Sequence, residues 1–144
     1  MKNVKAIGHV ALSVRDIDRS LDFYVNRLGF AEMFRLERDG RLWIVYLRIT
    51  DSQFLELFPD GAGDGAPPFA AIGINHFCLE VDDIDAAIKE ITDQGVTLTR
   101  PKKNGVDNND QAWIDDPDGN RIELMQLSKN AMQRDAIARL ARAG

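Results

Sequence analysis

Two histidines and two glutamates recur in this chain at one fixed spacing. The chain has only two histidines, His9 and His76, and a glutamate follows each of them 47 residues later, at Glu56 and Glu123. Imidazole nitrogen and carboxylate oxygen are donors that suit Zn, Ni or Co, and also Mn or Fe(II). Four such ligands on an octahedral ion leave two positions for water or substrate, as a catalytic metal requires. The four residues therefore predict one divalent metal site.

Each of these side chains also has an ordinary structural explanation. A lone histidine is more often a hydrogen-bonded core residue, and a strand glutamate more often faces solvent. In an alternating strand Cys78 points to the same face as His76 and could line the site, or it could simply pack. Tyr46 and Trp113 are aromatic strand residues that could wall a pocket or belong to the core.

The same four residues lie in an internal repeat. The segment HVALSVRDID at 9–18 matches HFCLEVDDID at 76–85 in six of ten positions, an offset of 67 that also carries Glu56 onto Glu123. The repeat predicts two copies of one module, about 4–58 and 71–127. Between them the stretch PDGAGDGAPPFAA at 59–71 is rich in Gly and Pro, which is typical of a linker.

Hydrophobic periodicity predicts the elements of the first module. They are a strand at 4–14, a helix over Ile17 to Leu28 that Asp16 or Asp18 can cap and Gly29 ends, a hairpin of 31–37 and 42–49 around Asp39-Gly40, and a strand at 53–58. His9 then falls in the first strand of the module and Glu56 in its last.

The second module repeats this order. We predict a strand at 73–81, a helix over Ile84 to Gln94 ending at Gly95, strands near 97–99, 111–115 and 121–127, and a terminal helix at 129–142. Lys102 and Lys103 then lie in a polar loop, where they could bind an anionic substrate or face solvent. The order of each module is βαβββ, and we predict the α+β class, with both modules in one domain spanning 1–144.

Composition narrows the class of protein. The chain has 144 residues, 44% hydrophobic and 28% charged, with a net charge of -5 and one cysteine. An acidic chain lacks the electrostatic footprint of a nucleic-acid binder. No apolar run approaches the length of a membrane span. One cysteine excludes an internal disulfide, and we expect a cytoplasmic protein.

Three segments carry a resemblance to the vicinal-oxygen-chelate superfamily, covering the chain to about residue 127. They are IGHVALSVRDIDRSLDFYVNRLGF at 7–30, INHFCLEVDDIDAAI at 74–88 and DDPDGNRIEL at 115–124. The His/Glu/His/Glu ligand set resembles that of glyoxalase I, whereas methylmalonyl-CoA epimerase has Gln where this chain has Glu56. Bacterial glyoxalase I has an arginine four residues after the first histidine, which holds a glutathione carboxylate, and an asparagine four residues after the second ligand. This chain has Ser13 and Asp60 at these places, so both anion-binding groups are absent and the substrate is left open.

The resemblance implies that the two βαβββ modules form a curved mixed sheet around the metal site. It also implies a metal-dependent lyase or isomerase that abstracts a proton next to a metal-bound oxygen. Because both histidines would be ligands, the base should be a carboxylate: Glu123 first, because it follows the DPDGN turn, and Glu56 as its counterpart. Relatives that pair modules across subunits imply a homodimer acting on a small molecule. The ligands could come from one chain or from two. The alternatives are an epimerase-like isomerase and a non-catalytic drug-binding protein of the same superfamily.

Overall fold

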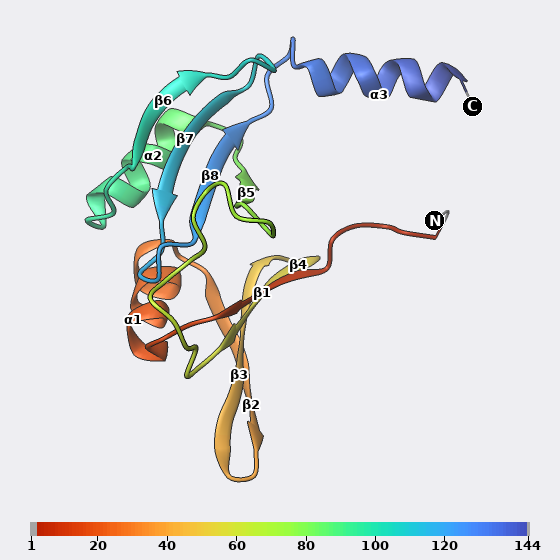
Figure 1. Cartoon of the computed structure of the whole chain (residues 1–144). Coiled ribbons are helices and arrows are strands. Elements are labelled where there is room, and N and C mark those ends of the chain that lie inside the picture. Colours follow the sequence, from red (N-terminus) through yellow and green to blue (C-terminus); the bar gives the residue numbers. More distant parts are fainter. Residues whose placement is uncertain (1–2, 144) are drawn as a thin grey trace. The chain divides into compact units, whose positions relative to one another are not determined.

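The chain folds into two compact units, Met1–Gly65 and Ala66–Gly144 (Figure 1). The computed structural model describes residues 3–143, so residues 1, 2 and 144 of the predicted domain lie outside the described residues. Each unit contains one His–Glu pair of the predicted site. The two units are described one at a time.

Unit 1 is one βαβββ module. Its elements are β1 (His9–Ser13), α1 (Ile17–Leu21), η1 (Asp22–Arg27), β2 (Ala31–Arg38), β3 (Arg41–Thr50) and β4 (Gln53–Phe58). The sheet order is β1-β4-β3-β2, with β1 parallel to β4 and the other neighbours antiparallel. Leu47, Leu55 and Leu57 are fully buried, which makes one face of the sheet the core of the unit.

The predicted helix over Ile17 to Leu28 is present, but it changes type halfway. Asp16 is the cap, and its side chain accepts hydrogen bonds from the backbone N–H groups of Asp18 and Arg19. From Asp22 to Arg27 the helix is a π-helix, and the N–H of Leu28 donates to the carbonyl of Phe23, five residues earlier. The element stops at Gly29, whose φ is 75°.

The predicted turn of the hairpin is also present. Asp39 and Gly40 both have positive φ, 52° and 71°, as the two central residues of a tight hairpin turn require. Two register shifts interrupt the pairing of β2 with β3, and the second leaves Trp43 without a partner between Leu42 and Ile44. Such a bulge lets a side chain leave the strict alternation of the strand.

Unit 2 repeats the module and adds a helix. Its elements are β5 (Phe77–Glu80), α2 (Ile84–Asp93), β6 (Arg100–Asn104), β7 (Asp110–Asp115), β8 (Arg121–Gln126) and α3 (Met132–Ala143). The sheet order is β5-β8-β7-β6, with β5 parallel to β8. Asp83 caps α2 as Asp16 caps α1, and both lie at the repeat offset.

Some predicted boundaries are wrong. The first strand of each module is shorter than expected, so His9 opens β1 and His76 lies just before β5. The strand expected near 97–99 lies at Arg100–Asn104, and Lys102 and Lys103 are therefore in an edge strand instead of a loop. Strand propensity is low in RPKKN, so its pairing with β7 decides its conformation.

Both modules have the predicted βαβββ order, and each forms its own four-stranded mixed sheet, so the α+β class is confirmed. Within residues 3–143, no helix is long and apolar enough to cross a membrane.

Candidate metal site

His9 and Glu56 lie close together in unit 1 because β1 and β4 are parallel neighbours. Ala11 pairs with Glu56 in that ladder, and His9 is two residues before Ala11 on the same face. The His9 Nδ1 lies 3.6 Å from the Glu56 Oε1. The Glu56 side chain is 9% exposed and the His9 side chain 54% exposed. A carboxylate is thus held in the sheet with an accessible imidazole beside it.

Tyr46 is the third polar group in this part of unit 1. It lies opposite Glu56 in the β3–β4 ladder, so the two side chains share a face. A hydrogen bond to Glu56 is the main cause that raises the pKa of Tyr46, because the neutral phenol donates to the carboxylate. The phenol therefore holds the Glu56 carboxylate in place from the side opposite β1.

His76 and Glu123 form the corresponding pair in unit 2. The His76 Nε2 lies 3.2 Å from the Glu123 Oε2, and the Glu123 side chain is 11% exposed. The other ring nitrogen, Nδ1, is 3.0 Å from the Asn75 Oδ1, and the Asn75 amide in turn donates to the Phe69 carbonyl. When the proton of the neutral ring lies on Nδ1 and is donated to Asn75, Nε2 carries a lone pair that can bind a metal ion on the side of the ring that faces Glu123.

Trp113 occupies in unit 2 the place of Tyr46 in unit 1. It lies opposite Glu123 in the β7–β8 ladder, and its ring meets the His76 ring edge-on at 4.7 Å between centroids. Its indole N–H is buried and has no hydrogen-bond partner within residues 3–143. Tyr46 and Trp113 thus each lie beside one of the glutamates. Their role as walls of a pocket stays a prediction, and Trp113 is also buried in the core.

Cys78 lies opposite Glu123 in the ladder of β5 with β8, on the face predicted from its alternation with His76. Burial of the thiol is the main cause that raises the pKa of Cys78 to about 12, although part of the residue is exposed. The negative charge of Glu123 acts in the same direction. Near neutral pH this thiol is protonated, so it adds no charge to the pair.

In each His–Glu pair, an imidazole nitrogen and a carboxylate oxygen lie at a separation that would suit two ligands of one metal ion. Two ligand atoms that are each about 2.1 Å from one ion lie about 3 Å apart at a right angle. The His–Glu separations of 3.6 and 3.2 Å are close to that distance. Among residues 3–143, no group of three or more His, Cys, Asp or Glu is arranged to hold an ion by itself. Each unit therefore contains one imidazole and one carboxylate of the four residues that the sequence predicts as ligands.

Asn75 is the residue of this site that sequence reasoning missed. The repeat aligns it with Gly8, which has no side chain, so the pattern gave no signal at this position. A polar residue directly before a candidate histidine ligand was the available hint, because ligand histidines usually donate their second nitrogen's proton to an oxygen.

The fold, the matched pairs and the turn before Glu123 define the class of protein. Residues 6–124 match the Glyoxalase/Bleomycin resistance protein/Dioxygenase superfamily, and the chain belongs to this family.

Particular relatives differ in function. The chain is 34% identical to a lactoylglutathione lyase of Neisseria meningitidis over 82% of this chain and 88% of the relative. It is 29% identical to a superfamily member of Sphaerobacter thermophilus, with a TM-score of 0.69, covering 85% of this chain and 98% of that structure. An antibiotic-binding protein of Streptomyces, TnmS3, is 25% identical with a TM-score of 0.67, covering 88% and 98%.

Proposed function

We propose that this protein is a divalent-metal-dependent lyase or isomerase of the glyoxalase I type, with His9, Glu56, His76 and Glu123 as the metal ligands. The observation that carries the proposal is the pair of matched His–Glu contacts, 3.6 and 3.2 Å, at equivalent places of the two modules. Similarity to a lactoylglutathione lyase supports the reaction class. When bound, a Zn, Ni or Co ion would polarise a substrate oxygen and acidify the neighbouring C–H.

The chain's own residues would then handle the proton. Glu123 takes it from the substrate carbon and returns it to the adjacent carbon, with Glu56 as its counterpart in the first module. Counted as whole residues, Glu56 is 6% exposed and Glu123 is 8% exposed, so both carboxylates are shielded from bulk water. Asn75 fixes the orientation of His76, and Tyr46 fixes Glu56.

The test is the metal content of purified protein after dialysis, measured by mass spectrometry. We expect about one divalent ion per four-ligand site. The His9→Ala and His76→Ala variants should each lose tight binding, whereas Glu90→Gln, an exposed carboxylate on α2, should keep the ion. Full metal content in the double histidine variant would refute the ligand set.

Likeness to TnmS3 supports a second function, a non-catalytic small-molecule binder. A binder of that kind needs no ion, so the same metal analysis separates the two. A protein that stays metal-free after growth with added Zn, Ni and Co would favour the binder.

A further inference from the structure

The glutamate-bearing face of unit 1 carries two rows of aromatic side chains beside Glu56. In the first row, Phe34 lies opposite Tyr46 and the rings stack at 4.5 Å, while Tyr46 lies opposite Glu56. In the second row, Trp43 meets Phe58 edge-on at 6.3 Å. Phe34 is 45% exposed, although aromatic side chains of this size are usually covered. This face, called the aromatic face below, leads directly to the His9–Glu56 pair.

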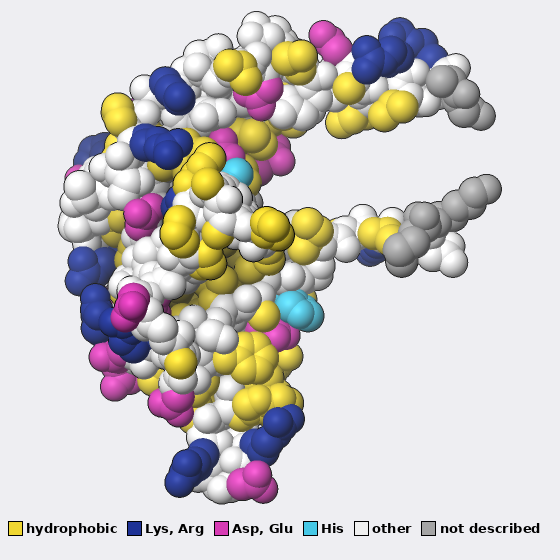
Figure 2. Space-filling model, viewed as in Figure 1, with side chains coloured by type: hydrophobic (Ala, Val, Ile, Leu, Met, Phe, Trp, Pro, Cys, Tyr) yellow, Lys and Arg dark blue, Asp and Glu magenta, His cyan; other side chains and the backbone are white. Residues whose placement is uncertain are grey.

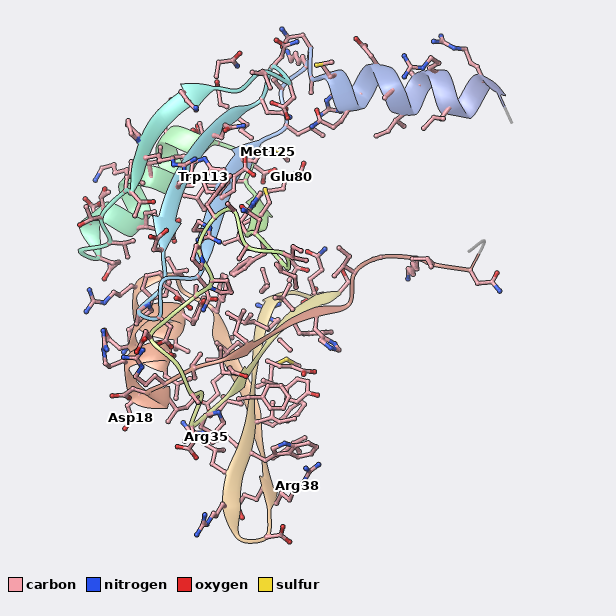
Figure 3. All side chains as sticks on the ribbon, viewed as in Figure 1. Asp18, Arg35, Arg38, Glu80, Trp113 and Met125 are labelled. Carbon is pink, nitrogen blue, oxygen red and sulfur yellow. The ribbon has the colours of Figure 1, made fainter. Side chains whose placement is uncertain are left out.

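A guanidinium group ends the second row. The Arg38 Cζ lies 3.5 Å from the centre of the Trp43 ring, the geometry of a cation–π contact. Arg35 sits on the opposite side of the hairpin and pairs with Glu32 at 2.7 Å, whereas no carboxylate within residues 3–143 pairs with Arg38 (Figure 3). The stacked guanidinium keeps the N–H donors along its edge free for the oxygens of a carboxylate or sulfonate.

The spacing of the two rows along the strands gives the minimum length of a ligand that contacts both rows. Trp43 is three residues from Tyr46 along β3, and Phe58 is two residues from Glu56 along β4. At about 3.3 Å per residue the rows lie about 7–10 Å apart. Figure 2 shows hydrophobic side chains gathered over the β2–β3 hairpin, with basic side chains at its tip. Arg38 lies on β2, two strands from Glu56 on β4, so one molecule that reaches Arg38 with an anionic end and Glu56 with its other end must be longer than this row spacing.

We infer that the aromatic face binds the substrate, and that the substrate is an organic acid with a flat apolar body, whose carboxylate or sulfonate group lies on Arg38, farther than the spacing of the two rows from the reacting end at Glu56. The inference deepens the proposed function and rests on it for the identity of the reacting end. Charge complementarity with Arg38 and the closeness of Glu56 favour such a small acid over a second copy of this chain.

The test uses full-length, chelator-treated protein and two probes with one skeleton: 8-anilinonaphthalene-1-sulfonate and its uncharged analogue N-phenyl-1-naphthylamine. Because no ion is needed, the result is separate from the metal analysis, and either proposal can fail alone. Arg38→Gln should weaken sulfonate binding about tenfold, the scale of one charged contact, and leave the neutral probe unchanged. Arg41→Gln, the matched control, removes a charge from the residue paired with Arg38 and should have less than about a twofold effect.

Phe34→Ser provides a second variant and should weaken both probes. Equal losses in the Arg38 and Arg41 variants would mean that only net charge attracts the sulfonate, which overturns the inference. Sulfonate binding that is unchanged in Arg38→Gln would also overturn the inference. If Phe34→Ser instead leaves probe binding intact and splits a dimer in sedimentation, a second copy covers the aromatic face and the acid-binding inference is wrong.

Discussion

In the proposed proton transfer, Glu123 is the base that takes the proton from the substrate carbon. Glu123→Gln retains an oxygen ligand, so most of the metal content should remain. Exchange of a substrate C–H proton with deuterated water should fall about 100-fold or more, because the amide cannot act as a base. The assay uses whichever compound of an α-hydroxycarbonyl panel the metal-loaded protein turns over.

Glu56→Gln is the matched variant for this experiment, since Glu56 occupies the same place in the other module. Near-normal exchange in Glu123→Gln with none in Glu56→Gln would transfer the role to Glu56. Near-normal exchange in both would place the base outside the four ligands, and the glyoxalase-like proton transfer would have to be abandoned.

Asn75 gives a prediction about metal affinity. Its Oδ1 is 3.0 Å from the His76 Nδ1, so Asn75→Ala should free the imidazole to rotate and to change tautomer. Loss of such an outer partner lowers metal affinity about 10–100-fold. Competition with a chromophoric chelator measures this, with Asn26→Ala on the exposed side of η1 as the control. Unchanged affinity would show that another contact orients His76.

The candidate site could be predicted from sequence only as far as the repeat reached. His9, Glu56, His76 and Glu123 were found because they recur at an offset of 67. Asn75 has no counterpart in the first module, and the orphaned indole N–H of Trp113 depends on packing that no pattern encodes. Arg38 was missed because its contact with Trp43 depends on a bulge, which strict strand alternation does not anticipate.

At the scale of elements, α3 is attached through a small polar network at its first turn. The Asp107 side chain accepts hydrogen bonds from Gln133 and Asn109, both at 2.8 Å, and its carbonyl accepts one from the Met132 N–H at 3.0 Å. The hydrogen bond from Gln133 is the largest cause that lowers the pKa of Asp107, followed by the one from Asn109. Folding thus favours the ionised carboxylate.

This network should make the attachment of α3 depend on acid. A carboxylate with a lowered pKa in the folded state stabilises the fold above its unfolded value, here 3.8, and the stabilisation is lost as pH falls through the folded value. The protection of the α3 amides against hydrogen exchange, relative to the intrinsic exchange rate at each pH, should therefore fall below pH 4, and we expect a similar loss of protection in Asp107→Asn at neutral pH. Asp135→Asn, exposed in the same helix, should resemble the wild type. Protection of α3 that is independent of Asp107 would contradict the prediction.

The elements themselves were predictable where local chemistry decides them. Asp16 as cap, Gly29 and Gly95 as stops and the Asp39-Gly40 turn each satisfy a backbone requirement that few residues can meet. The strand β6 was misplaced because RPKKN lacks strand residues and owes its conformation to pairing with β7. Tertiary pairing of this kind leaves little trace in a single sequence.

For the whole molecule we predict a homodimer. Each sheet ends in strands paired on one side only, β1 and β2 in unit 1 and β5 and β6 in unit 2. Large apolar side chains remain exposed, among them Ile7, Ile74 and Leu140. Unpaired edges and exposed apolar patches are commonly covered by association. Sedimentation velocity at micromolar concentration should give twice the chain mass, and a monomer with metal bound would contradict this.

The π-helical segment η1 marks a difference in length between the helices of the two modules. The cap and stop of the first helix, Asp16 and Gly29, are 13 positions apart, whereas those of the second, Asp83 and Gly95, are 12 apart. The first helix therefore has one residue more between its cap and its stop than the second, and the wider turns at Asp22–Arg27 accommodate it within the helix. An extra residue in a helix would otherwise turn every later side chain by about 100°, so the π-helical segment lets the two modules share one plan despite helices of unequal length.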